Sequence, residues 1–182
     1  MALTATMRRL DVALSDVDRG VYEQLELRLA QHPSEAMRYL VARTLAYCLC
    51  YEEGIAFGKG ISTAEEPAVV IRDLTGRLTT WIEVGTPNAE RLHKASKASP
   101  RLVVFTHNDP RFLVKEAASR AIHRVEAIDA FALEPTFLDA LGATLGRSAS
   151  WEVTHTDGQL YVAVDGQTLS APVTRVDLAT AP

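Results

Sequence analysis

The chain has 182 residues, of which 47% are hydrophobic, 23% charged and 7% aromatic, and its net charge is −4. These values are ordinary for a globular protein, and a domain of this size can fold without disulfides or metals. The negative charge excludes a uniformly basic protein that coats nucleic acid, because neutralisation of phosphates supplies the affinity of such proteins. The low aromatic content argues against recognition of single strands by base stacking. Any nucleic-acid site must therefore be a local basic patch.

The chain is expected to be cytoplasmic and to have no membrane segment. Its first residues lack the basic and apolar regions of a signal peptide, and no stretch approaches about 18 consecutive apolar residues. Two cysteines, Cys48 and Cys50, lie in an apolar helical pattern at a spacing that is not Cys-x-x-Cys. This pattern predicts two small core side chains in a reducing compartment.

The first expected element is a long strand at residues 3–14, where apolar and polar side chains alternate. The alternation shifts by one position at Arg8 and Arg9, which predicts a bulge there. Residues 16–20 have the composition of a turn.

The clearest helix is expected to start at Pro33-Ser34 and to end near residue 51. Ser34 can cap its first turn, and Glu35 is favourable at the positive end of the helix dipole. Apolar residues then recur at helical spacing, so one face of this helix should be core.

The remaining elements follow from turn residues, caps and periodicity. In chain order they are a strand at 55–57, strands at 68–73 and 78–84 around a turn at 75–76, a helix from Asn88 to about 99, a strand at 101–106, a helix from Asp109-Pro110 to about 123, a strand at 125–133, a helix at 135–145, and a hairpin at 151–164 around a type I′ turn at Asp157-Gly158.

A parallel pairing within the sheet is predicted by the strand–helix–strand order of residues 101–133, because parallel neighbours require a crossover. Hairpins on either side make the whole sheet mixed. The expected fold class is therefore α/β (α+β), a mixed sheet flanked by helices with additional hairpins in the N- and C-terminal parts. The pattern contains no repeat, low-complexity segment or linker, so residues 1–182 are expected to form a single domain.

The first candidate for chemistry is Glu83, near the end of the strand at 78–84. Alternation places it on the same face as Trp81. If helices cover both faces of the sheet, a carboxylate at this position is either paired or functional. The alternative is a Glu at the solvated end of a half-buried strand.

The companion of Glu83 can be estimated from the hairpin register. With a turn centred on residues 75 and 76, paired positions sum to about 151, so Glu83 lies opposite residue 68 and close to Glu66. Asp73 would lie five positions along the strand, or about 17 Å away at about 3.3 Å per residue. Two such carboxylates repel unless they share a proton or a divalent cation, and Mg²⁺ or Mn²⁺ suits oxygen ligands of this kind.

A basic stripe follows on the next helix, where Arg91, Lys94 and Lys97 recur at every third residue and Arg101 lies beyond them. Such a stripe commonly marks a solvated helix face. Here the helix starts directly after the Glu83 strand, near the strand end where ligands bind in open α/β sheets. Thr106-His107-Asn108 ends the following strand and can reach the same crevice.

Motifs along nearly the whole chain resemble those of the YaeQ family. They are Met1-Ala2-Leu3-x-Ala5-Thr6, His32-Pro33-Ser34-Glu35, Glu66-Pro67, Trp81-Ile82-Glu83-x-Gly85-x-Pro87 and Arg91-x-x-Lys94-Ala95. The resemblance implies a variation of the PD-(D/E)XK nuclease fold, in which acidic residues on a hairpin and a lysine two residues after the second of them bind metal and activate water.

The resemblance places Glu83 at the second acidic position. Glu66 or Asp73 would supply the first, and Glu35 matches the acidic residue of the leading helix. Gly85 stands where the lysine is expected, and some members of the superfamily carry that lysine on the next helix, where Lys94 lies.

Two functions are therefore expected to compete. The first is a metal-dependent nuclease in which Glu66 and Glu83 hold Mg²⁺ or Mn²⁺, Lys94 stabilises charge, and Arg91, Lys97 and Arg101 position the nucleic-acid backbone. The second is a catalytically silent nuclease-like module that binds nucleic acid or a protein partner in a regulatory role. The position of Lys94 relative to the carboxylates discriminates between them.

Overall fold

Ten strands form one mixed sheet in the computed structural model, which describes residues 4–59 and 65–180. The strands are β1 (Thr6–Asp16), β2 (Val21–Gln31), β3 (Ile55–Phe57), β4 (Val69–Arg72), β5 (Leu78–Val84), β6 (Arg101–Thr106), β7 (Asp129–Leu133), β8 (Ser148–Thr156), β9 (Gln159–Val164) and β10 (Gln167–Val176). The helices are α1 (Met37–Leu49), α2 (Ala89–Ala98), α3 (Pro110–Ala118) and α4 (Pro135–Thr144), with a 3-10 turn, η2 (Val125–Ala127).

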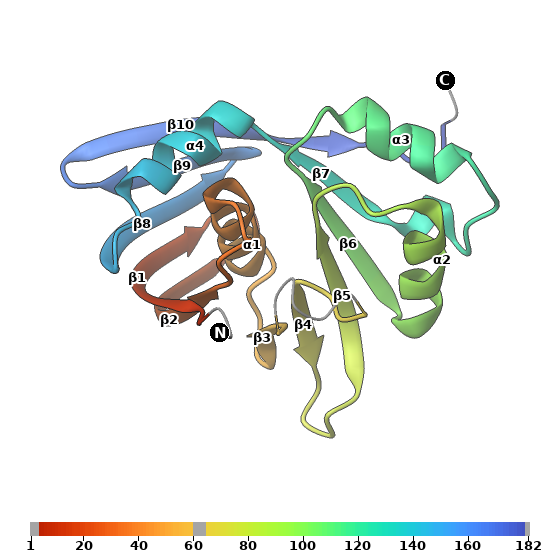
Figure 1. The fold of residues 1–182 in the computed structure, drawn as a ribbon, viewed down its shortest axis with the longest axis horizontal. Coiled ribbons are helices and arrows are strands. Elements are labelled where there is room, and N and C mark those ends of the chain that lie inside the picture. The colour runs from red at the N-terminus through yellow and green to blue at the C-terminus, as the bar shows by residue number, and fades with distance from the viewer. Residues whose placement is uncertain (1–3, 60–64, 181–182) are drawn as a thin grey trace.

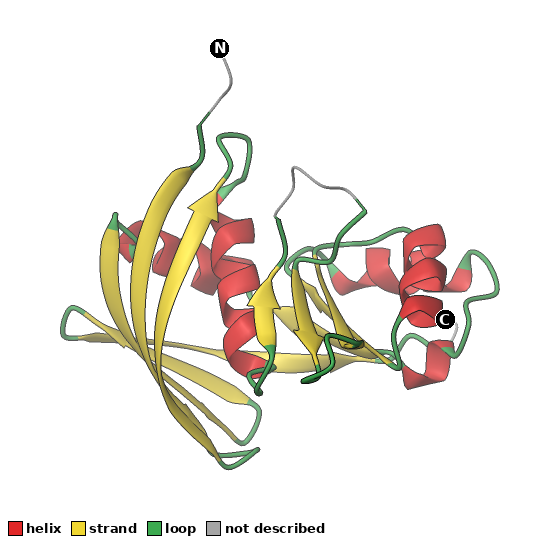
Figure 2. Ribbon diagram, turned by 90° about the horizontal axis from the view of Figure 1, so that it is seen from below, coloured by secondary structure: helices red, strands yellow, loops and turns green. Residues whose placement is uncertain are grey.

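The strand order is β2-β1-β8-β9-β10-β7-β6-β5-β4-β3. The sheet bends strongly, so that its first five strands curve around α1, while α2 and α3 lie beyond the other half (Figures 1 and 2). The strand β10 connects the halves, because Gln167–Pro172 pairs with β9 and Val173–Val176 pairs with β7. Pro172, which has no N–H to donate, lies at the change of partner.

Two hydrophobic clusters lie on opposite faces of the central strands. Along β6, Val103 and Phe105 pack into the cluster that contains α1 and α4, and Leu102 and Val104 pack against α2 and α3. The continuous apolar run of β6 is thus explained by helices on both faces. Glu83 on the neighbouring β5 faces the α2 side together with Trp81.

The predicted mixed sheet flanked by helices is confirmed, because β5, β6 and β7 are parallel and the hairpins on both sides are antiparallel. The strand 101–106 has the predicted bounds. Asn88 caps α2 by accepting from the Arg91 main-chain N–H. The Asp157-Gly158 turn has φ values of 51° and 70°, as a type I′ turn requires. Both cysteines are free and buried, as predicted.

The predicted bulge at Arg8 and Arg9 is wrong. The β1–β2 register runs without interruption from Thr6↔Gln31 to Asp16↔Val21. The apparent shift has another cause: Arg8 occupies the inward face, where its Nη1 donates to the Leu145 and Gly146 carbonyl oxygens at the end of α4 (3.0 and 2.8 Å).

The predicted cap at Ser34 is also wrong. The helix α1 starts at Met37, and its N-cap residue, Ala36, makes no side-chain cap. The Ser34 hydroxyl is instead 2.6 Å from His32 Nδ1 within the preceding turn. Two elements are shorter than predicted: α3 ends at Ala118, and residues 125–133 divide into η2 and β7.

Two long strands, β2 and β10, have no counterpart among the predicted segments, although hairpins were expected at both ends. In the described residues, no helix is long and apolar enough to cross a membrane.

Candidate functional site

The Glu83 carboxylate, near the end of β5, is buried and hydrogen-bonded to two other side chains. Its Oε1 accepts from Trp81 Nε1 (2.5 Å) and from Arg91 Nε (2.8 Å), and its side chain is only 6% exposed. Burial raises the pKa of the Glu83 carboxyl, and the hydrogen bonds from Arg91 and Trp81 lower it by less. The strand places this carboxylate toward α2 because alternation puts Ile82 and Val84 into the opposite core.

Arg91 links Glu83 to the loop before β4. Its Nη2 donates to the Glu66 carbonyl oxygen (2.8 Å), and its guanidinium lies 6.0 Å from the Trp81 ring centroid. Arg91 can reach Glu83 because it lies in the first turn of α2, which follows β5 after a short loop. Arg91, predicted to bind a nucleic-acid backbone, is thus an internal partner of Glu83.

The hairpin register is as predicted, since Val69↔Ile82 and Ile71↔Thr80 both sum to 151. Glu66 reaches the Glu83 site through its main-chain carbonyl. Its carboxylate instead faces Lys59, at 3.4 Å from Nζ and 3.4 Å from the main-chain N.

Asp73 has a local structural role in the β4–β5 turn. Its Oδ1 accepts from the Thr75 N–H (2.9 Å), the Thr75 hydroxyl (2.6 Å) and the Arg77 N–H (3.0 Å). These bonds lower the pKa of the Asp73 carboxyl. Asp73 therefore shapes the turn at the end of the hairpin opposite to Glu83.

Lys94 forms an ion pair with Glu65, and both side chains are exposed. Lys97 is exposed and makes no ion pair with the described residues. Arg101 lies on the other face of the sheet, beside Asp129 (3.4 Å), and lines a pocket together with Val103 and Phe105. The structure thus separates the members of the predicted basic stripe.

Glu35 is also occupied, in a buried ion pair. Its Oε1 accepts from Arg43 Nε at 2.6 Å, and the two side chains are 1% and 2% exposed. Arg43 also donates to the Ala30 carbonyl oxygen (2.7 Å), so the pair ties β2 to α1. Sequence reasoning missed Arg43, although its spacing of eight from Glu35 is a helical one.

Sequence reasoning also missed Tyr39, whose hydroxyl is within the electrostatic influence of both Glu83 and the Glu35–Arg43 pair. Burial raises the pKa of the Tyr39 hydroxyl, and the Glu83 charge raises it further. The Tyr39 ring contacts the ring of His107 edge-on, with centroids 6.2 Å apart. The spacing Glu35-x-x-x-Tyr39-x-x-x-Arg43 was the available signal.

His107 ends β6 beside an open hollow of about 490 Å³, which Thr86, Asn108 and Phe112 also line. Neither ring nitrogen of His107 has a hydrogen-bond partner among the described residues. Burial lowers the pKa of His107, so its ring is neutral near pH 7. Arg38 and Asp109 also line this hollow, so the hollow next to the strand end predicted to approach Glu83 is lined mostly by polar and charged side chains.

The candidate carboxylates do not fit a divalent metal in this arrangement. Among the described residues, no group of three or more His, Cys, Asp or Glu side chains is placed to hold a metal ion. Glu83 and Glu35 are each bound to an arginine, and Glu66 faces a lysine. Each oxygen that would bind a cation therefore lies next to a positive charge of the chain itself.

The comparisons with known proteins agree with this fold. The family model described as YaeQ protein matches residues 1–173. The chain belongs to the YaeQ family. A crystal structure of a YaeQ protein from Xanthomonas axonopodis pv. citri is 33% identical, covers 98% of this chain and 100% of its own, and has a TM-score of 0.88. A YaeQ crystal structure from Pseudomonas syringae is 29% identical, covers 98% and 97%, and has a TM-score of 0.85.

Curated relatives share the family name, and each is described as uncharacterized. The uncharacterized YaeQ protein of Escherichia coli K12 is 27% identical over 176 residues, which is 96% of this chain and 97% of that protein. The uncharacterized YaeQ protein of Salmonella typhi is 33% identical over 108 residues, or 59% and 60% of the two chains.

Proposed function

We propose that this YaeQ-family chain is a nuclease-like module of the PD-(D/E)XK type that binds nucleic acid through its α2–α3 layer and does not cut it. The proposal rests chiefly on one observation: the candidate catalytic carboxylates are bonded to cations or N–H groups of the chain, whereas several basic side chains on the α2–α3 layer have no acidic partner among the described residues. The mixed sheet, with Glu83 on the second strand of its hairpin, supports the superfamily assignment.

The charge distribution supports a local nucleic-acid site. Residues 89–124 contain eight Lys and Arg but three Asp and Glu, a net charge of +5. Because the whole chain has a net charge of −4, the other residues together carry −9. Arg101 lies on the other face of the sheet, and Arg91, Lys94 and Arg111 are paired with acidic side chains, so the attraction for phosphate rests on the other four cations of this segment.

The cations of this layer are accessible. Lys97, Lys115, Arg120 and Arg124 are exposed and make no ion pair with the described residues. The loop that carries Arg120 and Arg124 is joined to α2, because the His123 main-chain N donates to His93 Nδ1 (3.2 Å). We call these four residues the basic patch.

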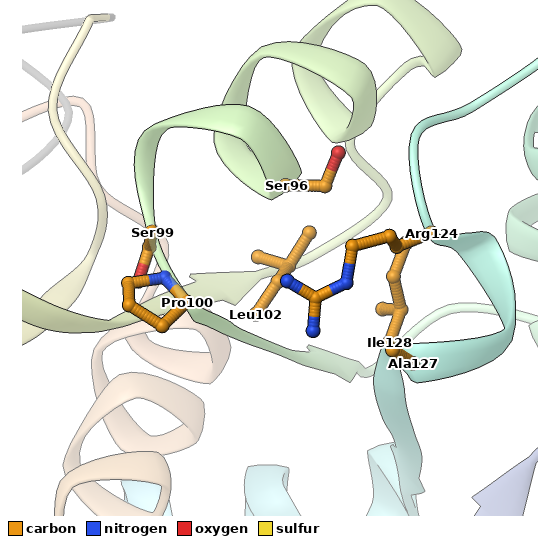
Figure 3. A pocket seen from close by; sticks show the side chains of 7 residues that line it. All are labelled: Ser96, Ser99, Pro100, Leu102, Arg124, Ala127 and Ile128. Carbon is orange, nitrogen blue, oxygen red and sulfur yellow. The ribbon is translucent and has the colours of Figure 1, made fainter.

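Figure 3 shows the Arg124 side chain extending over Leu102, between the end of α2 and η2. The hollow below it has a volume of only about 10 Å³, which is at the limit for a single water molecule. This hollow is too small for a ligand, and the Arg124 side chain is exposed. It is therefore available to a phosphate of an extended polymer.

Binding to short duplex DNA and to RNA, followed by fluorescence anisotropy across salt concentrations, tests the proposal. Replacing Lys97, Lys115 and Arg120 by Ala should weaken binding and reduce the slope of log K against log salt by about 2 to 3, since each phosphate contact contributes about 0.9.

The matched control is the triple variant Arg28→Ala, Arg77→Ala and Arg147→Ala. These exposed arginines lie outside the basic patch and make no side-chain bond to the described residues, so the net charge changes equally. The control should change the slope by less than about 1. Equal losses in both variants, or no binding by the unaltered protein, would overturn the proposal.

Cleavage is the competing function, and one observation favours it: Trp81 and Arg91 Nε both donate to Oε1 of Glu83, and among the described residues no hydrogen bond reaches Oε2. Incubation with Mg²⁺ and with Mn²⁺ should yield no cleavage product that disappears in Glu83→Ala. If such a product forms and Lys94→Ala lowers its rate on the order of 10²-fold, the protein is a nuclease with Lys94 stabilising charge.

A further inference from the structure

We propose that a second site, distinct from the basic patch, binds a small monoanionic carboxylic acid with an apolar body. The site is a pocket of about 280 Å³ between α1 and the concave face of β6, β7 and β10. We call it the seam pocket. Its walls include Leu49, Val103, Phe105, Phe131 and Val173, and Arg101 lies at its rim.

The walls of the seam pocket are suited to an apolar body. They come from four elements that the bend of the sheet brings together: the end of α1, the inward positions of β6 and β7, and the partner-switch position of β10. The Phe105 and Phe131 rings stack at 5.5 Å and give one wall a flat aromatic surface. Val103 and Phe105 are only 0% and 2% exposed, so the accessible apolar surface comes mainly from Phe131 and Val173. An apolar surface next to a small number of placed charges is typical of small-molecule sites.

The volume limits the size of the ligand. A cavity of about 150 Å³ holds one benzene ring, so about 280 Å³ accommodates roughly two fused rings or a short acyl chain. It is too small for a dinucleotide and much too small for a peptide segment. A compact acid of naphthoate size is the expected class.

Arg101 supplies the charge that selects an anion. Its Nε lies 3.4 Å from Asp129 Oδ2, and Arg175 shares the same carboxylate (3.2 Å to Oδ1). The two terminal nitrogens of Arg101 make no hydrogen bond to the described residues. A guanidinium with both terminal nitrogens available is a bidentate partner for a carboxylate.

The other charged groups of the rim are held in fixed positions. Arg19 donates to the buried Asp16 carboxylate (2.6 Å) and to the Tyr51 and Cys48 carbonyl oxygens at the end of α1 (3.1 and 3.3 Å). His155 lies between Asp16 and Asp18, at 3.0 and 3.6 Å. These contacts fix the positions of the charged groups at the rim, and repulsion from the Asp18 carboxylate increases with the negative charge of a ligand.

The probe for the site is 2-naphthoate, with its uncharged analogue 2-naphthamide as the comparison. Isothermal titration calorimetry should detect binding of 2-naphthoate and binding at least about tenfold weaker for 2-naphthamide, because a hydrogen bond between charged groups is lost. Arg101→Gln should weaken 2-naphthoate binding by a similar factor and should leave 2-naphthamide unchanged.

Two further variants separate this site from a general effect. Val173→Phe fills the seam pocket and should abolish binding of both probes. Arg111→Gln removes an exposed arginine of α3 that is likewise bonded to one aspartate, and it should change nothing. Melting curves establish that each variant is folded. Unchanged 2-naphthoate affinity in both Arg101→Gln and Val173→Phe, or no binding by the unaltered protein, overturns the proposal.

Discussion

At the scale of single residues, the environment of Glu83 determines its chemistry. A carboxylate at this depth would be strongly disfavoured without its two donors, and Arg91 and Trp81 offset only part of the desolvation, because the pKa of Glu83 stays raised. The sequence placed Glu83 on the same face of the strand as Trp81 and left open whether that face is covered. Whether it would meet a metal or an arginine depended on the side-chain direction of Arg91, which has no signature in the pattern.

The raised pKa of Glu83 predicts how stability depends on pH. In the folded state Glu83 stays protonated at pH values above its ordinary pKa of 4.5. Its contribution to the free energy of unfolding is therefore complete below pH 4.5 and is lost as the pH rises through the pKa of the folded state. A glutamine does not ionise, so Glu83→Gln should not lose stability over this pH range, and it keeps an oxygen acceptor for Arg91.

Urea unfolding of both proteins across this pH range provides the measurement. The free energy of unfolding of Glu83→Gln, relative to the unaltered protein, should rise between pH 4.5 and neutrality. Parallel curves would show that burial does not shift the carboxyl, and a relative fall with pH would mean that Arg91 lowers its pKa instead.

At the scale of elements, hydrophobic periodicity and helix-capping residues in the sequence identified most of the helices and strands. The strand β6 was predicted from its continuous apolar run, and α2 from Asn88, because these signals are local. The unassigned strand β2 carries a usable alternation at Leu25, Leu27 and Leu29, which are all buried. The strand β10 is hard to recognise from the sequence because it contains Pro172 and because its two parts pair with different strands, β9 and β7. Glu35 lies just before α1 and binds Arg43 within it, a contact that sequence spacing alone does not establish.

The Glu35–Arg43 pair is predicted to be essential to the junction of β2 and α1. Glu35→Ala should lower the free energy of unfolding by about 3–5 kcal/mol, because it leaves the Arg43 charge buried without its partner. The double variant Glu35→Leu, Arg43→Met removes both charges and should recover most of that loss.

Chemical denaturation of the three proteins measures the effect. If Glu35→Ala is as stable as the unaltered protein, the pair is not a structural junction, and Glu35 becomes available again for a functional role.

At the scale of the whole molecule, the continuous β10 strand should make the two halves of the sheet unfold together. The chain has two tryptophans, one on each side of this strand: Trp81 on β5 and Trp151 on β8. The variants Trp151→Phe and Trp81→Phe each leave one reporter. In both variants the midpoint of the fluorescence transition in urea should coincide with the midpoint of far-UV circular dichroism. Separate midpoints would mean that the halves are independent domains.

The place of β10 also has a consequence for synthesis on the ribosome. This strand is the last in chain order but lies in the middle of the sheet, between β9 and β7. Until it emerges, the nascent chain can form only two partial sheets, and the edges of β9 and β7 present unpaired main-chain groups. Edges of this kind associate with other chains. The interval before residues 167–176 are translated is therefore when the nascent chain is most open to association with other chains through these strand edges.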